Sequence, residues 1–140
     1  MITLGIDPGG RRIGVALSDP LGVTARPLTV IEHASLAGDV ERVVELAAAH
    51  KAERVVVGHP LNADGSVGPA ARRAGRFANA IRRKSGMEVV LWDEHLTTAE
   101  AEQIQQNRGP SPRAARSRDS IDMIAAAVLL QDYLNAQRRA

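Results

Sequence analysis

The residues best suited to chemistry in this 140-residue chain are three acids, each placed where an apolar element ends. Asp7 comes directly after the β-prone run of residues 2–6. Glu94 follows the apolar run of residues 89–92, with Asp93 beside it. A carboxylate among buried strands is costly unless something positive faces it. Each of these positions therefore calls for a cationic partner.

The third acid, Asp122, lies in the last predicted helix. Ala125, Ala126 and Leu129 follow it at helical spacing, which places Asp122 on or beside the buried face. Its neighbours in the helix are small or apolar, so the helix itself offers no cation, and a divalent ion is a suitable partner. Mg²⁺ and Mn²⁺ take oxygen ligands, and two such ions about 4 Å apart can activate water for phosphodiester cleavage. If the three acids converge, they predict a site of that kind.

Each acid also has a simpler interpretation. Asp7 could cap the glycine-rich turn at residues 8–12, Glu94 could be an ordinary charge at a strand end, and Asp122 could be a first-turn residue favoured by the helix dipole. Spacing alone does not show that the three converge. The histidines have no metal-ligand spacing, and no Ser-His-Asp set or P-loop is visible; the histidines are His33, His50, His59 and His95.

Arginine dominates the positive charge. The net charge is only +2, but nearly all of the 18 basic residues are arginines, which bind phosphate in a bidentate manner. Aromatic residues are scarce, so base stacking on an aromatic platform is not expected. The alternative for either basic cluster is an ordinary solvated surface. The clusters are Arg72, Arg73, Arg76, Arg82, Arg83 and Lys84, and then Arg108, Arg113, Arg116 and Arg118.

The hydrophobic pattern predicts the elements that must position these side chains. It indicates three leading strands, then strands alternating with helices, as expected for an α/β fold with a mixed five-stranded sheet flanked by helices on both faces. The length favours one domain over residues 1–140, and the absence of cysteine and of a long apolar run favours a soluble cytoplasmic protein. Strands are predicted over 2–6, 13–19, 24–31, 55–57 and 88–92, helices over 36–50, 69–84, from 97 and over 119–136, and a mobile basic loop over 108–118.

Four segments in order carry a resemblance to a known family. They are LGIDPG with RIGVA and SDP at residues 4–20, VGHPLNADG at 57–65, WDEHLTT at 92–98 and SIDMIAA at 120–126. With these motifs the chain resembles the YqgF/RuvX family of RNase H-like nucleases over nearly its full length. In two positions it departs from the family pattern: His95 stands where an arginine is usual, and His59 where an apolar residue is usual.

The resemblance implies an RNase H-like fold with antiparallel and parallel strands. It implies that Asp7, Glu94 and Asp122 are both the catalytic residues and the ligands of two Mg²⁺ or Mn²⁺ ions. The nucleic-acid backbone would then be held by arginines from the first turn and the two basic clusters. These are Arg12, Arg72, Arg76, Arg108, Arg113, Arg116 and Arg118.

The sequence leaves several functions open. The leading hypothesis is a metal-dependent endonuclease that processes the 5′ end of pre-16S rRNA in ribosome biogenesis. The alternative is a Holliday junction resolvase, which would favour a homodimer because a four-way junction needs two symmetric cuts. A non-catalytic ribosome- or nucleic-acid-binding module is a further hypothesis. A nucleotide-binding lobe like those of sugar kinases is disfavoured, because only one such domain is present.

Overall fold

The computed structural model describes residues 1–93 and 114–139, with side chains in the last helix described from residue 119 onward. The order of elements in these ranges agrees with the predicted order. The predicted helix from residue 97 lies outside the described residues. The elements are β1 (Thr3–Pro8), β2 (Arg12–Ser18), β3 (Ala25–Glu32), α1 (Leu36–Ala49), β4 (Arg54–His59), α2 (Pro69–Ser85), β5 (Glu88–Asp93) and α4 (Ala114–Arg139).

Local sequence explains where two of the helices begin and end. The Ser35 hydroxyl accepts a hydrogen bond from the Gly38 amide at 3.0 Å, which satisfies one of the free amides at the start of α1. Helix α2 begins with Pro69, whose missing amide is not needed there, and ends at Gly86 in the left-handed conformation (φ 72°). These caps confirm the predicted boundaries to within a residue or so.

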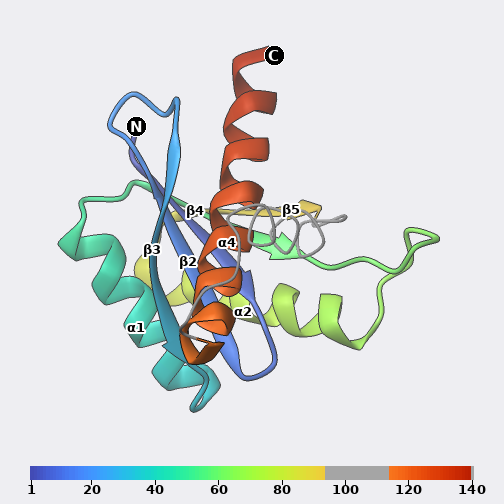
Figure 1. The fold of residues 1–140 in the computed structure, drawn as a ribbon. Helices are drawn as coiled ribbons and strands as arrows, with labels where there is room; N and C mark the ends of the chain where they lie inside the picture. Colours follow the sequence, from blue (N-terminus) through green and yellow to red (C-terminus); the bar gives the residue numbers. More distant parts are fainter. Residues whose placement is uncertain (94–113, 140) are drawn as a thin grey trace.

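The five strands form one mixed sheet in the order β3-β2-β1-β4-β5. Strands β3, β2 and β1 are antiparallel neighbours, and β1, β4 and β5 run parallel. The predicted combination of an antiparallel meander with parallel strands is confirmed. Because β1, β4 and β5 are parallel, their carboxyl ends meet at one edge of the sheet (Figure 1).

Helices cover both faces of the sheet, as predicted (Figure 1). Alternate side chains of each strand point to opposite faces. Leu4 and Ile6 of β1 pack into the larger core with α1 and α2. On the other face, Ala16 and Val56 pack against Leu130 of α4. Within the described ranges, no helix has the length and apolar character needed to cross a membrane.

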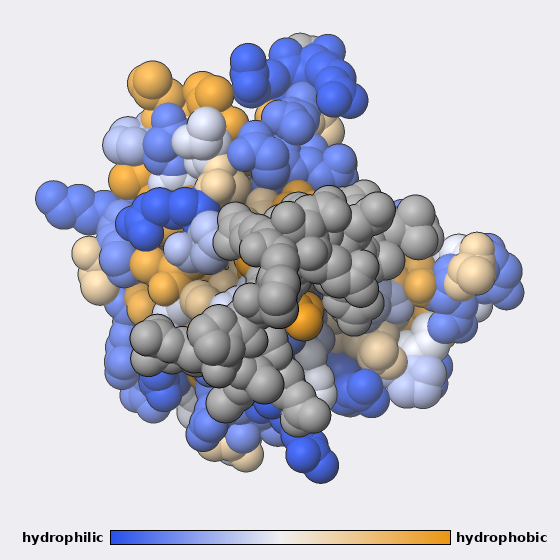
Figure 2. Space-filling view, in the orientation of Figure 1, coloured by the Kyte–Doolittle hydropathy of each residue, from blue (hydrophilic) through white to orange (hydrophobic). Residues whose placement is uncertain are grey.

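Helix α4 begins earlier than predicted. The interpretation of residues 108–118 as a loop is wrong for residues 114–118, which are helical. Alanine and arginine are among the strongest helix formers, and no proline follows Pro112, so nothing in this segment stops the helix. At its other end α4 extends past the sheet (Figure 1), and Figure 2 shows a hydrophilic surface there.

Candidate active site at the carboxyl end of β1

Asp7 lies near the carboxyl end of β1, directly opposite Gly14 of β2 in the antiparallel register. Residues opposite one another in such a pair project to the same face of the sheet. Gly5, two residues before Asp7, identifies this face, because a Cβ added to Gly5 would lie 2.8 Å from the Cβ of Leu130 in α4. Asp7 therefore projects on the face that α4 covers.

Gly14 brings the backbone of α4 next to Asp7. A Cβ placed on Gly14 would lie only 2.0 Å from the backbone carbonyl oxygen of Asp122, closer than real Cβ atoms come to any neighbour. The helix thus rests directly on the strand at this point, and only glycine leaves room for it. Asp7 and Asp122 are separated by more than a hundred residues in the sequence, and the Gly14 contact brings them to the same place.

Asp122 has a cationic partner that comes from β2 and not from its own helix. The Nε of Arg12 donates a hydrogen bond to Oδ2 of Asp122 at 2.7 Å, and Asp119 Oδ1 lies 3.8 Å from the same nitrogen. The bond to Asp122 raises the pKa of the Arg12 guanidinium above its usual value. Arg12 was predicted to contact nucleic acid; in this structure its Nε is bound to one of the proposed metal ligands.

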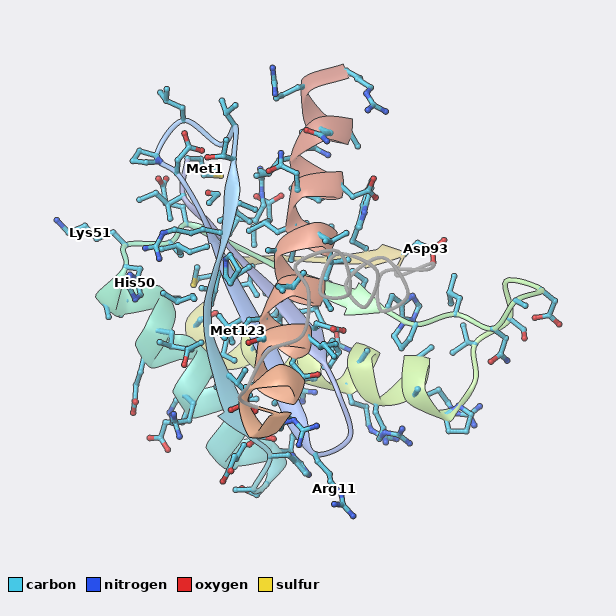
Figure 3. The ribbon with its side chains drawn as sticks, in the orientation of Figure 1. Met1, Arg11, His50, Lys51, Asp93 and Met123 are labelled. Carbon is cyan, nitrogen blue, oxygen red and sulfur yellow. The ribbon has the colours of Figure 1, made fainter. Side chains whose placement is uncertain are left out.

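The third predicted ligand, Glu94, lies outside the described residues, one position after β5 ends at Asp93. Trp92 belongs to the cluster packed on α4, and its Nε1 donates a hydrogen bond to Asp132 Oδ2 at 2.9 Å. Because side chains alternate along a strand, Asp93 and its register partner His59 project to the opposite face. Figure 3 shows Asp93 at the end of β5, away from α4.

The arginines predicted to contact nucleic acid lie on helices that cover opposite faces of the sheet. Arg72 and Arg76 lie on α2, which packs on the face opposite to α4 and the Asp122 side chain, and both are exposed. Arg116 and Arg118 lie in the first turns of α4. Arg108 and Arg113, together with His95, lie outside the described residues.

The donor set of this site is suited to a hard divalent cation. Two carboxylates, Asp7 and Asp122, come from neighbouring elements, and carboxylate oxygens are the ligands that Mg²⁺ and Mn²⁺ prefer. In the part of the chain that the structure describes, no group of three or more His, Cys, Asp or Glu side chains could hold a metal ion. A complete site would therefore need a ligand from outside these ranges, where Glu94 lies.

Another acid of the motif region has a structural role. Asp19 Oδ1 accepts hydrogen bonds from the backbone amides of Val23 at 2.7 Å and Thr24 at 3.0 Å. These bonds lower the pKa of the Asp19 carboxyl group, the Thr24 amide contributing most. Asp19 thus closes the turn between β2 and β3.

Sequence reasoning missed one buried acid. Asp39 lies among the polar positions of the helical pattern over 36–50, but it is only 4% exposed. Its Oδ2 accepts a hydrogen bond from Nδ1 of His33, and its Oδ1 accepts one from the Ala34 amide at 3.1 Å. The available signal was its position in the first turn after Ser35, where an acid can bond back to the residues before the helix.

Three comparisons with known proteins show which family and which fold the chain resembles. Residues 1–136 match a family described as RuvX, Holliday junction resolvase. A protein of Syntrophus aciditrophicus named "Putative pre-16S rRNA nuclease" is 42% identical over 136 residues, covering 97% of this chain and 89% of that protein. A protein of the same name from Pelotomaculum thermopropionicum is 43% identical over 140 residues, covering 99% of this chain and 90% of that protein.

Among solved structures, the chain is similar to Thermus thermophilus RuvC in complex with a Holliday junction substrate. The TM-score is 0.59 at 19% sequence identity, and the alignment covers 99% of this chain and 96% of that one. At this identity the likeness shows a shared fold, which agrees with the RNase H-like fold that the motifs implied.

Proposed function

Because the chain belongs to the RuvX family, as its motifs predicted, we propose that it is a metal-dependent nuclease that processes the 5′ end of pre-16S rRNA in the cytoplasm. The observation that carries this proposal is the contact between Gly14 and the backbone of Asp122, which brings two distant carboxylates, Asp7 and Asp122, to the end of β1. The names of the family's relatives support the choice of RNA as substrate.

In this proposal, Asp7, Asp122 and Glu94 hold two Mg²⁺ or Mn²⁺ ions. When bound, such ions polarise the phosphate and lower the pKa of water, which is the chemistry that phosphodiester hydrolysis requires. The chain's own contribution is to hold two carboxylates on rigid elements, one on a central strand and one on a helix that is seated on that strand. Glu94 would join them from the end of β5, at the same edge of the sheet as the end of β1.

The arginines would hold the nucleic-acid backbone. Arg12 lies beside Asp122 already, so a phosphate bound by its guanidinium would lie next to the carboxylates. Arg116 and Arg118 lie in the part of α4 that precedes Asp122 in the sequence, and Arg108 and Arg113 precede them. Arg72 and Arg76 lie on α2, on the face of the sheet opposite to α4, so they would contact a different part of the substrate.

The proposal is tested by comparing two substrates with Mn²⁺ present: a precursor 16S rRNA carrying its 5′ extension, and a four-way DNA junction. We expect cleavage of the rRNA, and complete loss of cleavage when EDTA removes the metal. Cleavage of the junction alone, by a dimer, would favour the resolvase alternative. Binding of either substrate without cleavage under any metal condition would instead support a non-catalytic binding module.

The pairing of Arg12 with Asp122 leads to a separate prediction about metal affinity. In the metal-free protein the guanidinium competes with a divalent cation for the same carboxylate. Replacing it, Arg12→Gln, should tighten Mn²⁺ binding about two- to fivefold, the size expected for a partly exposed ion pair. The measurement is the free Mn²⁺ signal in electron paramagnetic resonance.

Arg11→Gln is the matched control for this experiment. It removes the same charge one residue away, and Figure 3 shows Arg11 pointing outward from the turn between β1 and β2. It should change Mn²⁺ affinity much less than Arg12→Gln does. Equal effects of the two variants would mean that only net charge matters, and weaker Mn²⁺ binding in Arg12→Gln would contradict competition between guanidinium and metal at Asp122.

A further inference from the structure

A pocket lies on the face of the sheet opposite to α4. Its volume is about 280 Å³, and it is enclosed by the turn between β1 and β2, the start of α1 and the first half of α2. We name it the α1–α2 pocket. Part of its wall is apolar, formed by Ile13, Leu36 and Phe77. Most of its lining residues lie outside the motifs that carry the family resemblance.

The polar wall of the pocket is held in place by a buried carboxylate. Asp39 is 4% exposed, and its two oxygens accept hydrogen bonds from the His33 ring and the Ala34 amide. The His33 ring is bonded to Asp39 through Nδ1, which leaves Nε2 free of Asp39. The backbone amide of His33 is also held, by the carbonyl oxygen of Arg11 at 2.9 Å. His33 is thus oriented from two sides while its side chain stays 48% exposed.

Two arginines supply positive charge to the same pocket. Arg73 and Arg76 both line it, and a spacing of three residues places them on one side of α2. Among the residues that the structure describes, neither arginine has a carboxylate within salt-bridge distance, although Asp39 lines the same pocket. Two guanidinium groups without an ion-pair partner beside an apolar wall are suited to a ligand with a phosphate and a flat, weakly polar body.

We propose that the α1–α2 pocket binds one nucleotide of the single-stranded part of the substrate, with its phosphate on Arg73 and Arg76 and its base against the exposed side chain of Leu36. This rests on the proposed nuclease function. The position supports it, because Pro8 and Gly9 of the pocket wall directly follow Asp7 in the chain. A single-stranded nucleic acid that crosses the turn between β1 and β2 would meet the carboxylates on one face of the sheet and the pocket on the other.

The test measures binding by calorimetry in EDTA, so that it does not depend on the metal site. The probes are uridine monophosphate, uridine, inorganic phosphate and a single-stranded hexauridylate. Uridine monophosphate should bind more tightly than either phosphate or uridine alone. The double variant Arg73→Ala with Arg76→Ala should weaken binding of both uridine monophosphate and hexauridylate by about tenfold or more, because it removes charge-assisted hydrogen bonds.

Two further variants distinguish binding in the pocket from general attraction of the ligand to positive charge on α2. Arg83→Ala removes a guanidinium from the same helix outside the pocket, and it should leave nucleotide binding nearly unchanged. Ala70→Phe keeps all charges but adds bulk to an exposed position in the pocket wall, and it should weaken nucleotide binding as the double variant does.

Three outcomes would overturn the proposal. They are equal loss of binding in Arg83→Ala and the double variant, phosphate binding as tightly as uridine monophosphate, and loss of mononucleotide binding with hexauridylate binding unchanged. The last outcome would make the pocket a site for a free nucleotide. Failure of the nuclease proposal would be seen separately, as hexauridylate binding that depends on the pocket in a protein that cleaves neither rRNA nor DNA.

Discussion

Replacing Asp7 with asparagine is expected to reduce Mn²⁺-dependent cleavage by about a hundredfold or more. Even residues that only orient a metal ligand typically contribute 10- to 100-fold, so loss of a ligand charge should cost at least as much. Asparagine keeps the shape of the side chain but removes its negative charge. The measurement is the initial rate of precursor rRNA cleavage at saturating Mn²⁺, with Mn²⁺ affinity measured on the same samples.

Asp93→Asn is the matched control for Asp7→Asn. Asp93 is an exposed acid near the same edge of the sheet, but the alternation of β5 turns it to the face opposite to α4. This variant should retain wild-type cleavage. Both proteins should show thermal midpoints close to wild type, so that a lost rate is not a lost fold. Cleavage that survives Asp7→Asn would contradict the proposed role of Asp7, and equal losses in both variants would place Asp93 in the site.

Gly14→Ala is expected to have the second large effect, on stability and on cleavage together. The added methyl carbon would lie 2.0 Å from the Asp122 carbonyl oxygen, so α4 must move away from β2 by about an ångström to restore normal contact. Overpacking of this kind usually costs about 1–3 kcal/mol of unfolding free energy. A shift of that size at a catalytic group can also reduce the rate about a hundredfold. Urea unfolding and the cleavage rate measure the two effects.

A second glycine in the same hairpin provides the comparison. A Cβ added to Gly10 has no atom of the described residues within 4 Å. Gly10→Ala should therefore leave the unfolding free energy within about 0.5 kcal/mol of wild type. Similar stabilities of Gly14→Ala and Gly10→Ala would contradict the close packing of α4 on β2. They would also contradict the contact that brings Asp122 to Asp7.

Much of the fold follows from local signals in the sequence. Ser35, Pro69 and Gly86 mark helix ends through capping chemistry that needs only nearby backbone groups. A continuous apolar run such as residues 55–57 is typical of a strand covered on both faces, and the structure buries all three residues. The predicted start of α4 is too late because the glycine and prolines at residues 109–112 indicate a loop, which the prediction extends through the arginines to residue 118, while helix propensity decides the conformation from residue 114.

The candidate site was predictable in its residue types and less so in its geometry. Asp7 and Asp122 were selected because each ends or borders an apolar element, and the structure places them on the same face of the sheet next to Gly14. The role of Glu94 stays a prediction, since it lies outside the described residues. The importance of Gly14 was not foreseen, because a glycine that admits a distant backbone carries no local signal.

By itself, the sequence determined the elements, their order and the acids at their ends, because strand patterning, caps and turns depend on residues that are close along the chain. Tertiary structure alone decided which partners these residues have. Arg12 binds Asp122, 110 residues away in sequence, and the Ala25 amide donates to the Gln131 side chain, 106 residues away. Such pairings depend on how α4 packs against the sheet, and packing is set by contacts between segments that no local pattern relates.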